Sequence, residues 1–128
     1  MRKSRVKRPG TVEFYNVWAF GYGLQALTRA LARQDAGVEE AEIRAAAARL
    51  VRALEIYQVP DGGWGYYDFD LKSYHPTGSS TPFTTGTILI ALHEAQAHGI
   101  EVPRALAAKA VRSIRRCRMK DTAAATAR

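Results

Sequence analysis

The chain has 128 residues, a single cysteine and a formal net charge of +7. A hydrophobic content of 47% with 24% charged residues is typical of one globular domain with a moderate core. Because Cys117 is alone, an internal disulfide and a thiolate metal cluster are excluded, and we expect a reducing, cytoplasmic setting. No apolar run reaches the length of a bilayer span, and no apolar segment follows the basic N-terminus as a secretory signal requires.

The positive charge lies at the two ends of the chain. Residues 1–10 carry five Lys or Arg and no acidic residue, and residues 103–128 carry eight Lys or Arg and one acidic residue. Between them, residues 11–102 carry six basic and eleven acidic residues. Basic proteins often bind nucleic acid, but here the body of the fold is acidic, so nucleic acid is not an expected partner. We treat residues 1–10 as a basic tail.

Two helices are predicted before residue 58. Residues 12–33 place apolar residues at three- and four-residue steps, the spacing of one helix face. Residues 38–57 do the same with a narrower stripe, and glutamates crowd the first turn, where the helix dipole favours negative charge. The stripes are Phe14, Val17, Trp18, Gly21, Leu24, Leu27 and Leu31, then Ile43, Ala47, Leu50, Val51, Leu54 and Tyr57.

Two more helices are predicted after an aromatic, glycine-rich loop at residues 59–80. The third begins at Pro82 with Thr81 as its N-cap and ends near Gly99, since Pro favours the first helical position and Gly the end. The fourth opens at Pro103 and has basic outer faces. We therefore predict an all-α chain with two αα-hairpins, 12–58 and 81–119, and a disordered or truncated tail at 122–128.

The two hairpins resemble each other in sequence. Residues 18–27 align with 83–92, so that Gly21 matches Gly86, and residues 50–61 align with 110–121, so that Asp61 matches Asp121. Each unit reads as a buried helix, an amphipathic helix and an acidic turn. This is the pattern of a solenoid or toroid in which each hairpin buries one face on the next.

The turn after the second helix carries a recognisable motif. Gln58, Gly62 and Trp64 have the Gln-x3-Gly-x-Trp spacing, and the core Asp61, Gly62, Gly63, Trp64, Gly65 completes it. The motif resembles the QW repeat of squalene–hopene and oxidosqualene cyclases and the repeat of protein prenyltransferase β subunits. The resemblance covers roughly residues 11–121 and implies a partial α/α toroid. It also implies that the motif is architectural: the glutamine caps the next helix and the tryptophan stacks over it, which ties neighbouring outer helices together.

The second turn departs from this pattern. No Gly or Trp follows Asp121, and Arg118 stands where Gln58 stands in the first turn. A complete toroid of the resembled kind has five or six hairpins, and two are found here. We therefore expect a fragment or one part of an assembly, whose partners are the remaining repeats or another copy of the chain.

No active-site motif of the resembled families is complete. Class II cyclases use Asp-x-Asp-Asp, and Asp68 and Asp70 supply only the beginning of this motif. They are weak catalytic candidates, and the favoured interpretation is a pair of solvated loop carboxylates. The Asp-x-Cys zinc pattern of prenyltransferases is absent, and the three histidines lack ligand spacing, so neither a metal nor another cofactor is expected. The chain alone is not expected to be an enzyme.

Two surfaces remain as binding candidates. The aromatics Trp18, Tyr22, Trp64, Tyr66, Tyr67 and Phe83 are candidates for an apolar-ligand site, although toroid core packing is the favoured interpretation. The basic fourth helix is either an anion-binding module or a solvated outer helix, and the second is favoured. The leading hypothesis is a structural or partner-binding repeat segment; the alternatives are a fragment of a terpenoid cyclase or prenyltransferase-like enzyme and a nucleic-acid-binding helical module.

Overall fold

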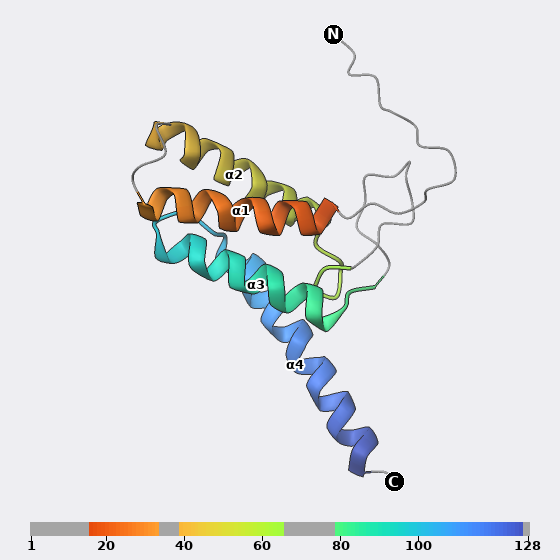
Figure 1. Ribbon diagram of the computed structural model, residues 1–128. Coiled ribbons are helices and arrows are strands. Elements are labelled where there is room, and N and C mark those ends of the chain that lie inside the picture. Colours follow the sequence, from red (N-terminus) through yellow and green to blue (C-terminus); the bar gives the residue numbers. More distant parts are fainter. Residues whose placement is uncertain (1–15, 34–38, 66–78, 127–128) are drawn as a thin grey trace, which may run out of the picture.

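The computed structural model describes residues 16–33, 39–65 and 79–126, and these ranges are all-α as predicted (Figure 1). The helices are α1 (Asn16–Arg33), α2 (Glu40–Tyr57), α3 (Pro82–Ala97) and α4 (Arg104–Thr126). The predicted start of the first helix, residues 12–15, lies outside the described ranges. Among the described helices, none combines the length and apolarity that crossing a membrane requires.

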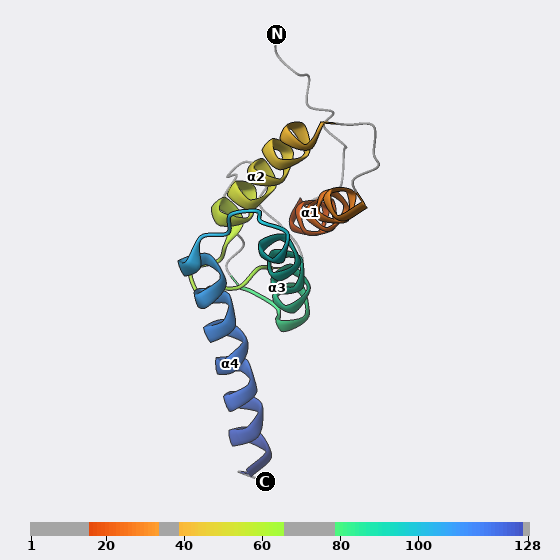
Figure 2. The same ribbon diagram turned by 90° about the vertical axis from the view of Figure 1, so that its left-hand side faces the viewer.

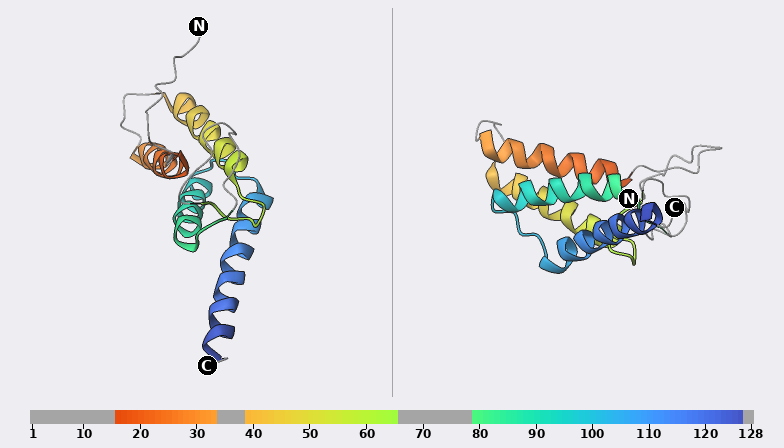
Figure 3. Two further views of the ribbon diagram at one scale, coloured as in Figure 1. Left: turned by 90° about the vertical axis from the view of Figure 1, so that its right-hand side faces the viewer. Right: turned by 90° about the horizontal axis from the view of Figure 1, so that it is seen from below.

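The four helices form two successive αα-hairpins, and each hairpin contributes one helix to each of two layers. Helices α1 and α3 lie side by side and run in the same direction, while α2 and α4 form the second layer and run back (Figures 1 and 2). The view from below shows the same pairing (Figure 3). The sequence alignment of the first helix with the third and of the second with the fourth therefore corresponds to equivalent places in the layers.

Glycine lets α1 approach its neighbours closely. A Cβ on Gly21 would lie 2.6 Å from Ile88 Cδ1 of α3, and one on Gly23 would lie 3.1 Å from Leu50 Cδ1 of α2. The absence of a Cβ at these two positions is what allows the close approach. Gly86, which aligns with Gly21, has nothing within 4 Å of such a Cβ. The repeat is thus visible in helix order but not in this packing contact.

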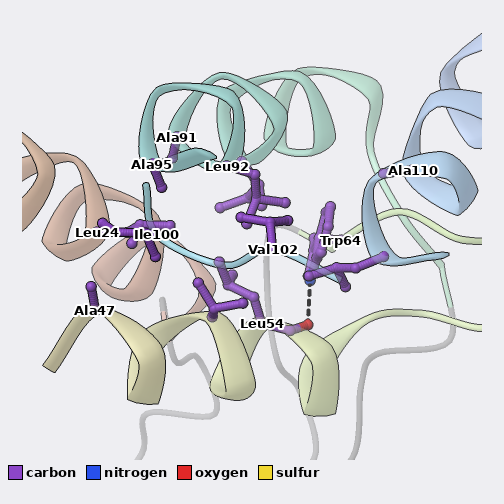
Figure 4. Packing of buried hydrophobic residues seen from close by; sticks show 13 residues of the cluster. Leu24, Ala47, Leu54, Trp64, Ala91, Leu92, Ala95, Ile100, Val102 and Ala110 are labelled. Atoms are coloured by element: carbon purple, nitrogen blue, oxygen red, sulfur yellow. Dashed lines mark hydrogen bonds between the residues drawn. The ribbon is translucent and has the colours of Figure 1, made fainter. Parts of the chain in front are cut away.

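The core lies between the layers and includes residues from all four helices (Figure 4). Leu24 of α1, Leu54 of α2 and Ile88 of α3 are completely buried, and so is Trp64 from the turn after α2. The first turn of α4 contributes Leu106 to this core, and its side chain is 3% exposed. Full burial of a large apolar side chain contributes roughly 1.5–3 kcal/mol, so these residues are the main source of stability.

Both ends of α3 lie where the sequence predicts them. Pro82 is at the first helical position and Thr81 is the N-cap residue, although its hydroxyl donates to Thr84 Oγ1 at 2.7 Å instead of accepting from the backbone. At the other end Gly99 has a φ of 80°, and the amide of Ile100 donates to Ala95 O at 3.0 Å. This is the Schellman arrangement, which needs a residue at positive φ.

A side-chain hydrogen bond from Arg44 joins the start of α2 to the end of α3. Arg44 donates from Nη1 to Gly99 O at 3.2 Å and forms an ion pair with Glu40 at 2.9 Å. Because Arg44 is partly exposed, the ion pair itself contributes little, and its value is in satisfying a carbonyl past the end of α3.

The fourth helix is longer than predicted. It continues to Thr126, past the expected end at residue 119 and through much of the tail expected at 122–128. Asp121 therefore lies within a helix and not in a turn equivalent to that of Asp61. The physical reason is that residues 123–125 are alanines, the strongest helix formers, and no glycine or proline follows Asp121 to end the helix.

Candidate functional site

Residues 58–65, hereafter the connector, form a compact turn between α2 and α3. The amide of Val59 donates to Gly63 O and the amide of Gly62 donates to Val59 O, both at 2.8 Å. Gly62 has a φ of 100°, a conformation that residues with a Cβ rarely adopt. The turn brings the side chain of Gln58 against α4 and that of Trp64 against α2, while Asp61 bonds to Ser80, just before α3.

Gln58 joins the turn to the start of α4. Its Nε2 donates to Gly62 O at 2.8 Å and to Leu106 O at 3.0 Å. The resemblance implies a cap on the next helix that ties neighbouring outer helices together, and the contact falls in the first turn of α4. The amide nitrogen donates to a carbonyl there, however, whereas an N-cap residue accepts from a backbone N–H.

Trp64 fills the space between α2 and α3. It has no exposed surface, and its Nε1 donates to Leu54 O at 2.9 Å, the dashed line in Figure 4. Its backbone amide donates to Thr85 Oγ1 and its carbonyl accepts from the amide of Thr81, both at 3.0 Å. The side chain is therefore a core residue tied to the preceding helix, while its backbone is tied to the following one.

Asp61 lies where the connector meets α3 and α4. Oδ1 accepts from the amide of Gly63 at 2.9 Å, and Oδ2 accepts from Ser80 Oγ at 2.7 Å. The Asp61 carbonyl accepts from the guanidinium of Arg116. Partial burial acts to raise the pKa of the carboxyl, but the hydrogen bonds from Ser80 and Gly63 and the charge of Arg116 outweigh it, so this pKa lies below its ordinary value.

The connector glycines are needed because the helices come so close. A Cβ on Gly62 would overlap the carbonyl oxygen of Lys109 in α4. One on Gly63 would lie 2.6 Å from both Ser80 Cβ and Thr85 Oγ1. All the motif glycines are buried, including Gly65. The predicted structural motif is thus brought together as one site, and its polar groups are engaged in joining helices.

The aromatic candidates divide into two groups. Trp18 stacks on Tyr22 with ring centroids 5.5 Å apart and an interplanar angle of 17°, and it contacts Phe83 of α3 at 6.0 Å. Tyr22 is 56% exposed and Phe83 57% exposed. We name these three residues the aromatic patch. Trp64 does not belong to it because it is buried in the core, and Tyr66 and Tyr67 lie outside the described residues.

The remaining candidates give no further site. Asp68 and Asp70 lie outside the described residues. Within the described ranges, no three His, Cys, Asp or Glu residues lie together as a metal would require. The connector partners Ser80, Thr85 and Arg116 were not predicted from the sequence, and Ser80 Oγ also lies 3.4 Å from Ser113 Oγ of α4. The cluster of Ser and Thr at residues 79–85 was a signal for Ser80 and Thr85, but it did not point to Arg116.

The chain was compared with protein-family models, with curated proteins and with solved structures, and none of the three comparisons found a match.

Proposed function

We propose that this chain is a repeat segment of an α/α toroid of the prenyltransferase and squalene-oxidase kind. In this proposal it has no active site of its own and binds an apolar partner, either further helical repeats or an apolar molecule. The proposal rests on the motif resemblance together with a separation of tasks between the connector and the aromatic patch.

The connector supports the structural half of the proposal. Gln58 Nε2, the two Asp61 carboxylate oxygens and Trp64 Nε1 each make a hydrogen bond with the backbone or with Ser80. Groups held in this way stabilise the turn. Among the described residues, the strongest motif of the sequence is thus engaged in architecture.

The aromatic patch supports the binding half, and it is the observation that carries the proposal. Tyr22 and Phe83 expose more than half of their surface although both lie on helices of the α1 and α3 layer. Ile90, two turns after Phe83 on the same side of α3, is 56% exposed. Adjacent exposed apolar side chains of this size commonly mark a contact surface.

The test compares a double variant of the aromatic patch with a single variant at an exposed apolar position of α2. We expect the double variant Tyr22→Ser with Phe83→Ser to lose both the binding of an apolar fluorescent probe and any concentration-dependent increase in mass by light scattering. Ile56→Ser is the matched control, because Ile56 is also 56% exposed but lies on α2. If the patch variant behaves as the wild type, or if the Ile56 variant loses as much, the aromatic patch is not the contact surface and the binding half of the proposal is wrong.

A further inference from the structure

Over the part of α4 whose side chains the structure describes, the exposed side carries only one sign of charge. Between Arg104 and Arg118 it has six basic residues and no acidic one, and all six are exposed. At 100° per residue they fall within about half of the helix circumference. The opposite side, with Leu106, Ala110 and Ser113, is buried. We name the six residues the basic face: Arg104, Lys109, Arg112, Arg115, Arg116 and Arg118.

Helix α2, the equivalent helix of the first hairpin, shows that an exposed helix side need not carry a single sign of charge. Helix α2 carries three arginines and three glutamates, and Arg44 pairs with Glu40. In α4, Arg112 is three residues from Arg115 and four from Arg116, and Arg116 also donates to the Asp61 carbonyl. Like charges at these spacings disfavour a helix. The chain thus maintains an unfavourable charge arrangement on one of its two outer helices.

We propose that the basic face of α4 binds the phosphate backbone of double-stranded DNA without reading its sequence. Arginine and lysine supply the charge-assisted donors that phosphates accept. The inference is independent of the proposed repeat function, because it uses α4 and not the aromatic patch. It is also confined to this helix, so it is compatible with an acidic body that does not itself bind nucleic acid.

The dimensions of α4 fit a duplex. The rise from Arg104 to Arg118 is about 21 Å, and a DNA duplex of that length carries about twelve phosphates. A helix of about 10–12 Å diameter is accommodated by a major groove about 12 Å wide. The C-terminal half of α4 projects beyond the other three helices (Figures 1 and 2), and Arg115, Arg116 and Arg118 of the basic face belong to this half.

The same observations disfavour the other polyanions. A helix that lies in a membrane surface inserts an apolar face, but Leu106 and Ala110 are already buried, and Val111 is only 37% exposed. Single strands are bound by stacking on aromatic rings, and among the described residues the exposed rings of Tyr22 and Phe83 lie on α1 and α3. Duplex RNA has a major groove too narrow for a helix.

The test is fluorescence anisotropy with a labelled DNA duplex of mixed sequence, measured over a series of salt concentrations. If four to six phosphates are neutralised, log K should fall with log salt with a slope of about −3.6 to −5.4. The variant Arg112→Glu with Arg115→Glu should weaken binding at least about tenfold and make the slope shallower by about 1.8. The milder pair Arg112→Gln with Arg115→Gln should shift both in the same direction, and circular dichroism checks that α4 stays helical.

A matched control separates α4 from net charge. Arg49→Glu with Arg52→Glu makes the same change in charge at exposed positions of α2, and it should leave both affinity and slope close to those of the wild type. The proposal is overturned if this control loses as much as the α4 variant, or if the wild type shows no salt-dependent binding. It is equally overturned if replacing the basic residues of 1–10 abolishes binding while the α4 variants do not. Binding to anionic phosphatidylserine vesicles without binding to the duplex would assign the basic face to a membrane surface instead.

Discussion

Gln58 and Leu106 are 48 residues apart in sequence, and the side-chain amide of the first donates to the backbone carbonyl of the second at 3.0 Å. The same Nε2 donates to Gly62 O at 2.8 Å. One glutamine thus closes its own turn and fastens that turn to the first turn of α4. The arrangement is favourable because Nε2 carries two hydrogens and can donate one to each of the two partly buried carbonyl oxygens.

Replacing Gln58 by alanine should therefore reduce the free energy of unfolding by about 1–3 kcal/mol, because both carbonyl contacts are lost. Gln58→Glu should be worse at neutral pH, since a carboxylate would face two carbonyl oxygens. Its protonated form can still donate one hydrogen bond, so the pKa of the introduced carboxyl is raised in the folded state. The stability of that variant should recover as the pH is lowered and be lost as it rises.

Urea unfolding followed by circular dichroism measures both effects. Gln96→Ala, at an exposed position of α3, is the control and should change stability by less than about 0.5 kcal/mol. A Gln58→Ala variant as stable as the control would show that the link to Leu106 contributes nothing.

Two glycines should respond oppositely to the same substitution. Gly62→Ala places a Cβ at a φ of 100° and against Lys109 O, so we expect a loss of at least about 1–3 kcal/mol from the backbone conformation alone. Gly86→Ala fills open space within α3 and should stabilise the protein by about 0.5–1 kcal/mol. Thermal and urea unfolding of the pair checks the signs; a loss at Gly86 would mean that its surface is occupied.

Trp64→Phe removes a buried hydrogen bond to Leu54 O and leaves a cavity, and it should cost about 2–4 kcal/mol. Trp18→Phe should cost less, because Trp18 is only half-buried. The Trp18 variant also leaves Trp64 as the single tryptophan of the chain. Its fluorescence should be blue-shifted and protected from acrylamide until the protein unfolds. Strong quenching of Trp64 in the folded protein would contradict its burial.

The ionised Asp61 should contribute stability that acid removes. Its folded pKa lies below the ordinary value of 3.8, so the contribution is complete above that value and is lost as the pH falls through it towards the folded pKa. We expect the stability difference between wild type and Asp61→Asn to be larger at pH 6 than at pH 3. The measurement is urea unfolding at both pH values. A difference that is constant between them would show that the charge of Asp61 is not what the contacts with Ser80 and Gly63 stabilise.

The helices and the connector were predictable because their signals are local. Apolar residues at helical spacing, Pro82 at a helix start, Gly99 at a helix end and the sharp turn at Gly62 each depend on residues next to one another in the chain. The end of α4 was predicted wrongly because a local signal was given too little weight. The expected repeat of the first turn outweighed the local evidence of residues 123–125, which are alanines.

The amino-acid sequence by itself determined four helices, their order and the turn chemistry of residues 58–65. Only the tertiary structure decided that Trp64 is a core residue and not part of an exposed aromatic surface, and that Thr85 and Arg116 hold the connector. It also decided that Gly21 is filled by Ile88 while its counterpart Gly86 is open. The physical reason is that these contacts join segments between 21 and 67 residues apart. Such contacts depend on which helix faces meet, and neither periodicity nor a short motif specifies that.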